Sequence, residues 1–244
     1  MSETVARFPV GASVLSRIRI GLKALAILKY EPDHPVQGPL FEWCMDSAIL
    51  RQLAKDFSET PEGRRLLAER PTLQGGDLDL DALSKYPRGT LGHEFAKYFS
   101  DNEIHPFATT FPIDSDEAFM AKRYRETHDL LHVITGYATH MLGEIELQAF
   151  VWGNLGLNSA RMIVAYSVPM RLGICGVKEL GLFFKRLRLA YARGQKSRNV
   201  MSIEFEKYWD RPVSELAAEW CAPMPAELPV VTEGVYLPPK PAMA

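Results

Sequence analysis

Two histidines and two carboxylates in one short stretch of the sequence have the residue types and spacing of a metal site. The stretch reads HDLLH over residues 128–132, and Glu144 follows it. On a helix, residues four positions apart share a face with Cβ atoms about 5–6 Å apart, so His128 and His132 can bind one metal ion. Asp129 lies about 100° around the helix from His128 and can ligate the metal, orient an imidazole or act as a base. Two histidines and a carboxylate suit zinc, and with open positions they also suit ferrous iron.

Glu144 can reach the two histidines only if the chain turns back between them. Along a continuous helix, about twelve residues at about 1.5 Å each would place it about 18 Å beyond His132. Gly136 is a good residue for ending the first helix, and Thr139 is a fair N-cap for a second. The sequence therefore predicts a helix–turn–helix pair that brings Glu144 back to His128 and His132.

Helical periodicity extends over most of the remaining sequence. Between Ser13 and Lys29, Leu15, Ile18 and Leu22 recur at three- and four-residue spacing, with Ser13 as an N-cap. Three prolines and a glycine over residues 31–39 predict a break in helix. No alternating apolar and polar run is long enough for a sheet. Further helices are expected over residues 41–57, from residue 61 onward, from 91 to about 101 and from about 114 to 136. Others are expected over 139–153, 159–172 and 177–193, and from 203 or 212 to 220.

These patterns predict an all-α, mainly helical fold. No internal repeat or low-complexity linker divides the sequence, so we expect one multi-helix domain over residues 1–222. Residues 223–244 contain six prolines and are expected to form an irregular tail.

Composition and charge argue against several classes of protein. The 244 residues include 28 Lys+Arg and 30 Asp+Glu, a net charge of −2, so we expect no general nucleic-acid binding. Cys44, Cys175 and Cys221 are far apart, and they predict neither a disulfide framework nor a zinc ribbon but a reducing compartment. We expect no secretory signal or transit peptide, and no apolar run reaches the about 18 residues that a membrane-spanning helix needs.

A basic segment near the C-terminal part of the sequence has two interpretations. Between Lys178 and Arg198 there are seven basic residues against one acid, Glu179, with apolar residues such as Leu182 and Phe184 among them. This pattern indicates either a helix attracted to anionic lipid or an ordinary solvated helix face. The first expected helix also carries three basic residues and has the same two interpretations.

Four segments of the sequence resemble the ubiquinone (coenzyme Q) biosynthesis proteins of the Coq-four family. HDLLHVITGYATHMLGE is similar to the family signature HDxxH, eleven residues and then Glu, with the same spacing. Three further segments are similar to segments that flank this signature in the family: YPRGTLGHEFAKYF, RYRETHDLLH and FEKYWDRPVSELAAEW. The resemblance covers roughly residues 84–220. Two features depart from the family: Ala217 or Ala218 stands where the C-terminal region often has Arg, and a proline-rich tail follows Trp220. Both departures point to a paralogue acting on a related quinone precursor.

The resemblance implies a largely helical homodimer that lies against a membrane and holds a polyprenyl substrate in an apolar channel. It implies oxidative decarboxylation at ring carbon one of a 4-hydroxy-3-polyprenylbenzoate, with a hydroxyl replacing the carboxylate. By this resemblance His128, Asp129, His132 and Glu144 bind a divalent metal. We expect zinc ahead of iron, and we expect Asp129 to be the catalytic residue as well. We expect a peripheral location on the cytoplasmic, inner face of a membrane and partners among other quinone-biosynthesis enzymes, which the protein also organises.

Two other functions fit parts of the sequence. A metallohydrolase would use HDLLH with Asp129 as its base, but aspartate is one methylene shorter than the glutamate of zinc peptidases. An HD-type phosphohydrolase would need His93 or His105 upstream and Asp210 downstream, which leaves His132 and Glu144 without a role. A non-catalytic, isoprenoid-binding scaffold would carry a structural metal closed by four protein ligands.

Overall fold

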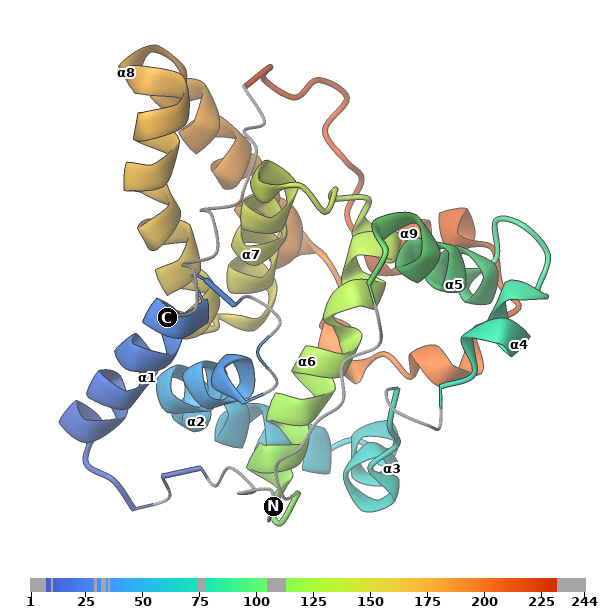
Figure 1. Ribbon diagram of the computed structural model, residues 1–244. Helices are drawn as coiled ribbons and strands as arrows, with labels where there is room; N and C mark the ends of the chain where they lie inside the picture. Colours follow the sequence, from blue (N-terminus) through green and yellow to red (C-terminus); the bar gives the residue numbers. More distant parts are fainter. Residues whose placement is uncertain are drawn as a thin grey trace. The chain divides into compact units, whose positions relative to one another are not determined.

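The computed structural model describes residues 8–9, 11–28, 30–31, 34, 36–73, 78–104 and 113–231. These residues form helices and turns, with no strand beyond an isolated bridge between Thr90 and Pro212, which confirms the all-α class (Figure 1). The chain divides into two compact units: unit 1 comprises Met1–Leu78, His105–Thr127 and Leu237–Ala244, and unit 2 comprises Asp79–Ile104 and His128–Tyr236. The single domain over residues 1–222 stays a prediction, and most of the predicted tail lies outside the described residues.

Unit 1 is built around a close pair of helices. It contains α1 (Val14–Leu28), α2 (Gln37–Ser58), α3 (Pro61–Glu69) and the first part of α6 (Asp116–Thr135). Gly21 and Ala24 of α1 are buried, and a Cβ on Gly21 would lie 3.2 Å from Cβ of Cys44 on α2. Small residues therefore let the two helices approach, while five larger aliphatic side chains of α1 are exposed: Val14, Leu15, Ile18, Leu22 and Ile27.

The second helix begins earlier than its sequence predicts. It starts at Gln37, inside the segment expected to be a break, and Pro39 lies in its first turn. Backbone N–H groups in the first turn of a helix have no partner within the helix, so proline there removes no hydrogen bond. Pro39 thus lies where a helix begins and does not break it.

Unit 2 contains the helices on both sides of the HDLLH motif. They are α4 (Leu80–Ser84), α5 (Leu91–Asn102), the end of α6, α7 (Met141–Leu155), α8 (Asn158–Lys196), the 3-10 turns η2 (Val200–Ser202) and η3 (Phe205–Lys207), and α9 (Val213–Trp220). The start of α5 is held by the chain before α9, because Leu91 and Gly92 donate N–H bonds to the carbonyls of Arg211 and Trp209 at 2.9 Å. These bonds satisfy donors that the first turn of a helix leaves open.

Backbone contacts fix α7 against α8. A Cβ on Gly153 would collide with the Tyr191 carbonyl oxygen, and one on Gly194 would collide with that of Phe150. Asn154 completes the join, since its amide donates to the carbonyl oxygens of Gly194, Ser197 and Arg198 at 2.9–3.3 Å. The close approach of two helix backbones positions α7, and with it Glu144, within unit 2.

A bend divides α8 into the two helices that its sequence predicts. Gly176 has φ 67° and ψ −175°, which lies outside helical geometry, and the patterns over residues 159–172 and 177–193 occupy the two limbs (Figure 1). A positive φ of this size is accessible to glycine without steric cost. Within the described ranges, every helix is too short or too polar to cross a bilayer.

Glu42 on α2 carries a carboxyl whose neutral form the fold favours. Its Oε2 atom is buried and has no hydrogen-bond partner within the described part of the chain. Burial raises the pKa of this carboxyl from 4.5 to about 8, while the Arg125 guanidinium opposes the rise and Asp46 adds to it. Glu42 is therefore protonated in the folded protein at neutral pH and ionised in the unfolded chain.

We predict that Glu42→Gln removes part of the pH dependence of stability. Between pH 4.5 and about 8, folded protein holds a proton at Glu42 that the unfolded chain has lost, so the free energy of unfolding falls as the pH rises. Glutamine has no proton to lose, so the Tm of the variant should rise relative to that of the parent across this range. A difference in Tm that stays constant with pH would contradict this assignment.

Candidate metal centre

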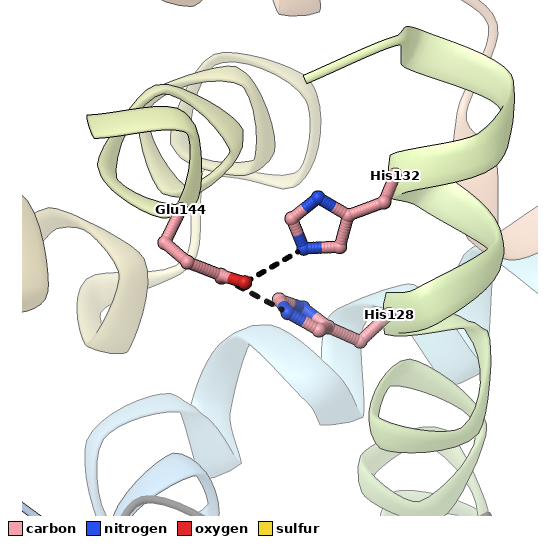
Figure 2. A group of neighbouring side chains, drawn as sticks. All are labelled: His128, His132 and Glu144. Carbon is pink, nitrogen blue, oxygen red and sulfur yellow. Dashed lines mark ion pairs between the residues drawn. The ribbon is translucent and has the colours of Figure 1, made fainter. Parts of the chain in front are cut away.

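The structure brings His128, His132 and Glu144 together within unit 2. The two histidines lie one turn apart on α6, and Glu144 lies in the first turn of α7 (Figure 2). Nε2 of His128 is 3.4 Å from Oε2 of Glu144, and Nε2 of His132 is 3.0 Å from Oε1. The ligand atoms of the three residues all lie within 4.8 Å of one another, so the group can hold a metal ion.

The turn that joins α6 to α7 is the predicted one, with a different capping residue. Gly136 has φ 75° and its N–H donates to the His132 carbonyl at 2.9 Å, which ends α6 as expected. The N-cap of α7 is His140 rather than Thr139, because Nδ1 of His140 accepts the Gly143 N–H at 3.2 Å. Thr139 instead donates its hydroxyl to Oδ1 of Asn102 at 2.7 Å, which ties the turn to α5.

Gly143 allows the turn to lie directly against α7. A Cβ at this position would collide with the backbone of Ala138, including its carbonyl oxygen. Because Gly143 immediately precedes Glu144, the same close approach that folds the turn sets the position of the carboxylate. The sequence contains this glycine, but spacing alone gives no sign that it is needed.

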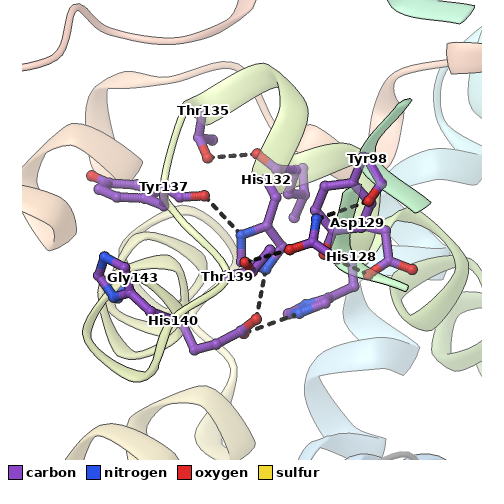
Figure 3. A network of polar contacts seen from close by, with 12 residues as sticks. Tyr98, His128, Asp129, His132, Thr135, Tyr137, Thr139, His140 and Gly143 are labelled. Atoms are coloured by element: carbon purple, nitrogen blue, oxygen red, sulfur yellow. Dashed lines mark hydrogen bonds and ion pairs between the residues drawn. The ribbon is translucent and has the colours of Figure 1, made fainter. Parts of the chain in front are cut away.

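The Tyr137 carbonyl orients the more deeply buried imidazole. Nδ1 of His132 donates to it at 2.9 Å, so in the neutral ring Nε2 is the nitrogen without a proton, and it faces Glu144 (Figure 3). That Nε2 atom is buried, and no described group meets it with hydrogen-bond geometry, although Glu144 lies close. A buried nitrogen lone pair aimed at a carboxylate suits a bound cation, so the residues fit a divalent metal.

The site favours a charged carboxylate. Burial raises the pKa of Glu144, but the adjacent His128 and His132 outweigh burial and hold the pKa well below its usual range. Burial lowers the pKa of His132, and the ion pair with Glu144, the Tyr137 carbonyl and the charge of Asp129 together raise it above its usual value. The side chain of Glu144 is 40% exposed, so solvent reaches one side of the group.

Asp129 lies outside the three-residue group. The Tyr98 hydroxyl on α5 donates to its Oδ1 at 3.3 Å, and the Tyr98 ring stacks on the His132 imidazole with centroids 5.7 Å apart (Figure 3). The roles of Asp129 as ligand and catalytic residue stay predictions. Tyr98 has no signal in the sequence, because it comes from a separate helix and no spacing rule connects it to the motif.

Other histidines considered from the sequence are not in this group. Nδ1 of His93 lies 3.0 Å from Oε1 of its neighbour Glu94, and His105 lies outside the described residues. A surface hollow of about 350 Å³ adjoins His132 and is lined in part by Lys97, Tyr98 and Thr139, but not by His128 or Glu144. A group of three protein ligands is typical of a catalytic metal site, whereas a structural site is closed by four.

Comparisons with known proteins find one family along most of the chain. The sequence profile of the family described as "Coenzyme Q (ubiquinone) biosynthesis protein Coq4" matches residues 40–225. The "Ubiquinone biosynthesis protein COQ4 homolog, mitochondrial" of Xenopus tropicalis is 34% identical over 86% of this chain and 75% of its own length. The protein of the same name from Danio rerio is 37% identical over 80% of this chain and 72% of its own length.

A solved structure shares the fold. The crystal structure of a Nostoc punctiforme protein with a suggested role in ubiquinone biosynthesis superposes with a TM-score of 0.66. The comparison covers 88% of this chain and 98% of that one at 22% identity. This similarity supports the helical architecture alone.

We predict that His132→Ala and Glu144→Ala each abolish stoichiometric metal binding. Each change removes one of three ligands, while the helices that carry them keep their packing. Elemental analysis after dialysis against zinc measures the binding, and circular dichroism checks the helix content. His93→Ala is the matched control and should keep the metal. Full zinc occupancy in either ligand variant would refute the assignment.

Tyr98 gives a second prediction, which concerns the groups that support the ligands. Tyr98→Leu removes both the stacked ring and the hydroxyl, so Co²⁺ affinity should fall about tenfold or more, as it does when support of a metal-bound histidine is lost. Tyr98→Phe keeps the ring and should fall between the parent and Tyr98→Leu. Titration of the visible Co²⁺ absorption measures both, and equal affinities in all three proteins would contradict this role.

Proposed function

Because the chain belongs to the family of coenzyme Q (ubiquinone) biosynthesis protein Coq4, we propose that it decarboxylates a quinone precursor oxidatively. The substrate class is a 4-hydroxy-3-polyprenylbenzoate, and a hydroxyl replaces the carboxylate at ring carbon one. The observation that supports an enzyme best is the three-ligand group of His128, His132 and Glu144, which leaves coordination positions for substrate.

The proposed cofactor is a divalent metal, with zinc ahead of iron. His128 and His132 would hold it with their Nε2 atoms and Glu144 with its carboxylate. A bound metal supplies Lewis acidity, which holds the carboxylate or phenolate of a substrate and favours negative charge on the ring. Dioxygen is the proposed oxidant: overall, the benzoic acid, dioxygen and water give the ring-hydroxylated product, carbon dioxide and hydrogen peroxide.

The chain's own residues prepare the site for this chemistry. The Tyr137 carbonyl keeps the proton of His132 on Nδ1, so that Nε2 stays available as a ligand. The two imidazoles keep Glu144 ionised, and burial of His132 excludes water from one side of the group. Asp129, whose carboxylate accepts a hydrogen bond from Tyr98, is the second carboxylate of the motif and is the proposed acid or base for the substrate.

Two alternatives are less well supported. A scaffold with a structural metal needs a fourth protein ligand, whereas the group within the described residues contains three. A zinc hydrolase is less well supported because the family matched is one of ubiquinone biosynthesis, and because aspartate is one methylene shorter than the glutamate base of zinc peptidases. Both observations favour the decarboxylase.

The setting proposed for the reaction follows from its lipid substrate. We propose that the protein is a homodimer located peripherally on the inner, cytoplasmic face of a membrane and works beside other quinone-biosynthesis enzymes, which it also organises. A polyprenyl tail partitions into the bilayer, so a peripheral enzyme meets its substrate at the membrane surface.

The reaction is tested with a carboxyl-labelled, short-chain 4-hydroxy-3-prenylbenzoate in air. Protein loaded with zinc or with ferrous iron should release labelled carbon dioxide and form the ring-hydroxylated product, while His132→Ala should lose about 100-fold or more of the rate. Asp129→Asn separates two roles: loss of metal identifies a ligand, and loss of rate with the metal retained identifies a catalytic group. Release of no label with either metal, from protein that binds the substrate, would favour the scaffold.

A further inference from the structure

The bend in α8 produces a corner of unusual composition on unit 2. We call residues 172–188 the α8 elbow. Gly176 breaks the helix there, so the two limbs meet at an angle, and Figure 1 shows α8 reversing its course at this point. A long helix that bends at a glycine presents the side chains on both sides of the bend at one exposed tip.

The elbow exposes large apolar side chains. Val177 is 77% exposed, and four further residues are about 40% exposed: Leu172, Ile174, Leu182 and Phe184. The side chains that serve the interior of unit 2 are different ones, since Phe183 and Leu187 are buried. The second limb of α8 therefore carries two apolar faces, and the core accounts for one of them. An exposed apolar patch of this kind marks an interaction surface.

The charge around this patch is positive. Lys178, Lys185 and Arg188 are exposed on the same limb, with Glu179 as the acid among residues 177–196. Two other arginines on the second limb of α8 bind partners within unit 2. Arg186 donates two hydrogen bonds to the Glu146 carboxylate, at 2.6 and 2.9 Å, and Arg193 donates to backbone carbonyls. The exposed basic residues therefore face outward beside the apolar ones.

We propose that the α8 elbow is a membrane-docking surface for anionic lipid. Val177, Gly181 and Phe184 follow each other at four- and three-residue spacing, so they share the face that enters the boundary between headgroups and acyl chains. Lys178, Lys185 and Arg188 bind the anionic headgroups around it. Because no described helix can span a bilayer, this contact is interfacial. It deepens the proposed peripheral location by naming the surface responsible.

The proposal connects the membrane to the metal group through the same unit. Glu144 lies on α7, and α7 packs against α8 through the backbone contacts at Gly153 and Gly194. Docking of the elbow therefore places the unit that carries the three ligands at the bilayer, where a polyprenylated aromatic substrate resides. A second copy of the chain is the competing occupant, and the test distinguishes the two.

Vesicle flotation measures the contact directly. The full-length protein is mixed with vesicles of phosphatidylcholine, either alone or with about one third phosphatidylglycerol. We expect it to bind the anionic vesicles, and we expect added salt to weaken this binding. Val177→Asp should reduce this binding about tenfold or more, because a charge then replaces an inserted side chain. The triple variant with Lys178→Gln, Lys185→Gln and Arg188→Gln should bind the anionic vesicles more weakly. Its binding to pure phosphatidylcholine vesicles should equal that of the parent.

Matched controls keep these results specific to the elbow. Ala218→Asp changes an exposed residue of α9, outside the elbow, and should bind like the parent. A Val177→Trp variant should show fluorescence quenching by brominated lipid, and Ala218→Trp should not. Circular dichroism confirms that each variant remains folded.

Three results would overturn the proposal. Failure of the parent to bind either vesicle would do so, as would parent-like binding by Val177→Asp. If Val177→Asp converts a dimer to monomers while vesicle binding persists, the elbow is an interface between copies. His132→Ala separates this proposal from the proposed reaction, because it should lose the metal and turnover while still binding vesicles.

Discussion

The reversal of the chain between α6 and α7 is the constraint on which the candidate site depends. Two histidines one turn apart are a common arrangement, and the third ligand makes them a site that can hold an ion. Glu144 becomes that ligand because α6 ends at Gly136 and the turn packs against Gly143, where no side chain fits. The distances of 3.0 and 3.4 Å from Glu144 to the two imidazoles follow from this packing.

The remaining helices of unit 2 hold the reversal in place. Arg193 on α8 donates to the Thr135 carbonyl at the last residue of α6, and Asn102 on α5 accepts the Thr139 hydroxyl from within the turn. Backbone contact between α7 and α8 then fixes the helix that carries Glu144. Support from several elements keeps three ligands together that do not form a continuous segment, as rigid metal sites require.

The sequence predicts the motif and its folding back, because both depend on local rules. Spacing on a helix pairs His128 with His132, and the conformational freedom of glycine predicts the end of α6 at Gly136. It assigns the wrong cap to α7, because a histidine side chain accepts the bond that threonine usually accepts. It also predicts too late a start for α2, since proline breaks the interior of a helix but not its first turn.

Tertiary contacts are what the sequence does not predict. Tyr98 lies against His132 and Asp129 only because α5 packs beside α6, and no pattern within either helix indicates that pairing. Likewise, hydropathy predicts that the second limb of α8 is amphipathic, but it does not tell which apolar side chains are buried. The structure buries Phe183 and exposes Phe184, which turns an ambiguous pattern into a defined surface.

X-ray absorption spectroscopy of the zinc-loaded protein tests the central claim most directly. The geometry predicts a shell of nitrogen and oxygen atoms at about 2.0–2.1 Å, with the outer-shell scattering of two imidazoles that come from His128 and His132. Loss of the zinc, and of this scattering with it, in His128→Ala would assign the scattering to the motif. A sulfur shell at about 2.3 Å, or a spectrum without imidazole scattering, would contradict the account.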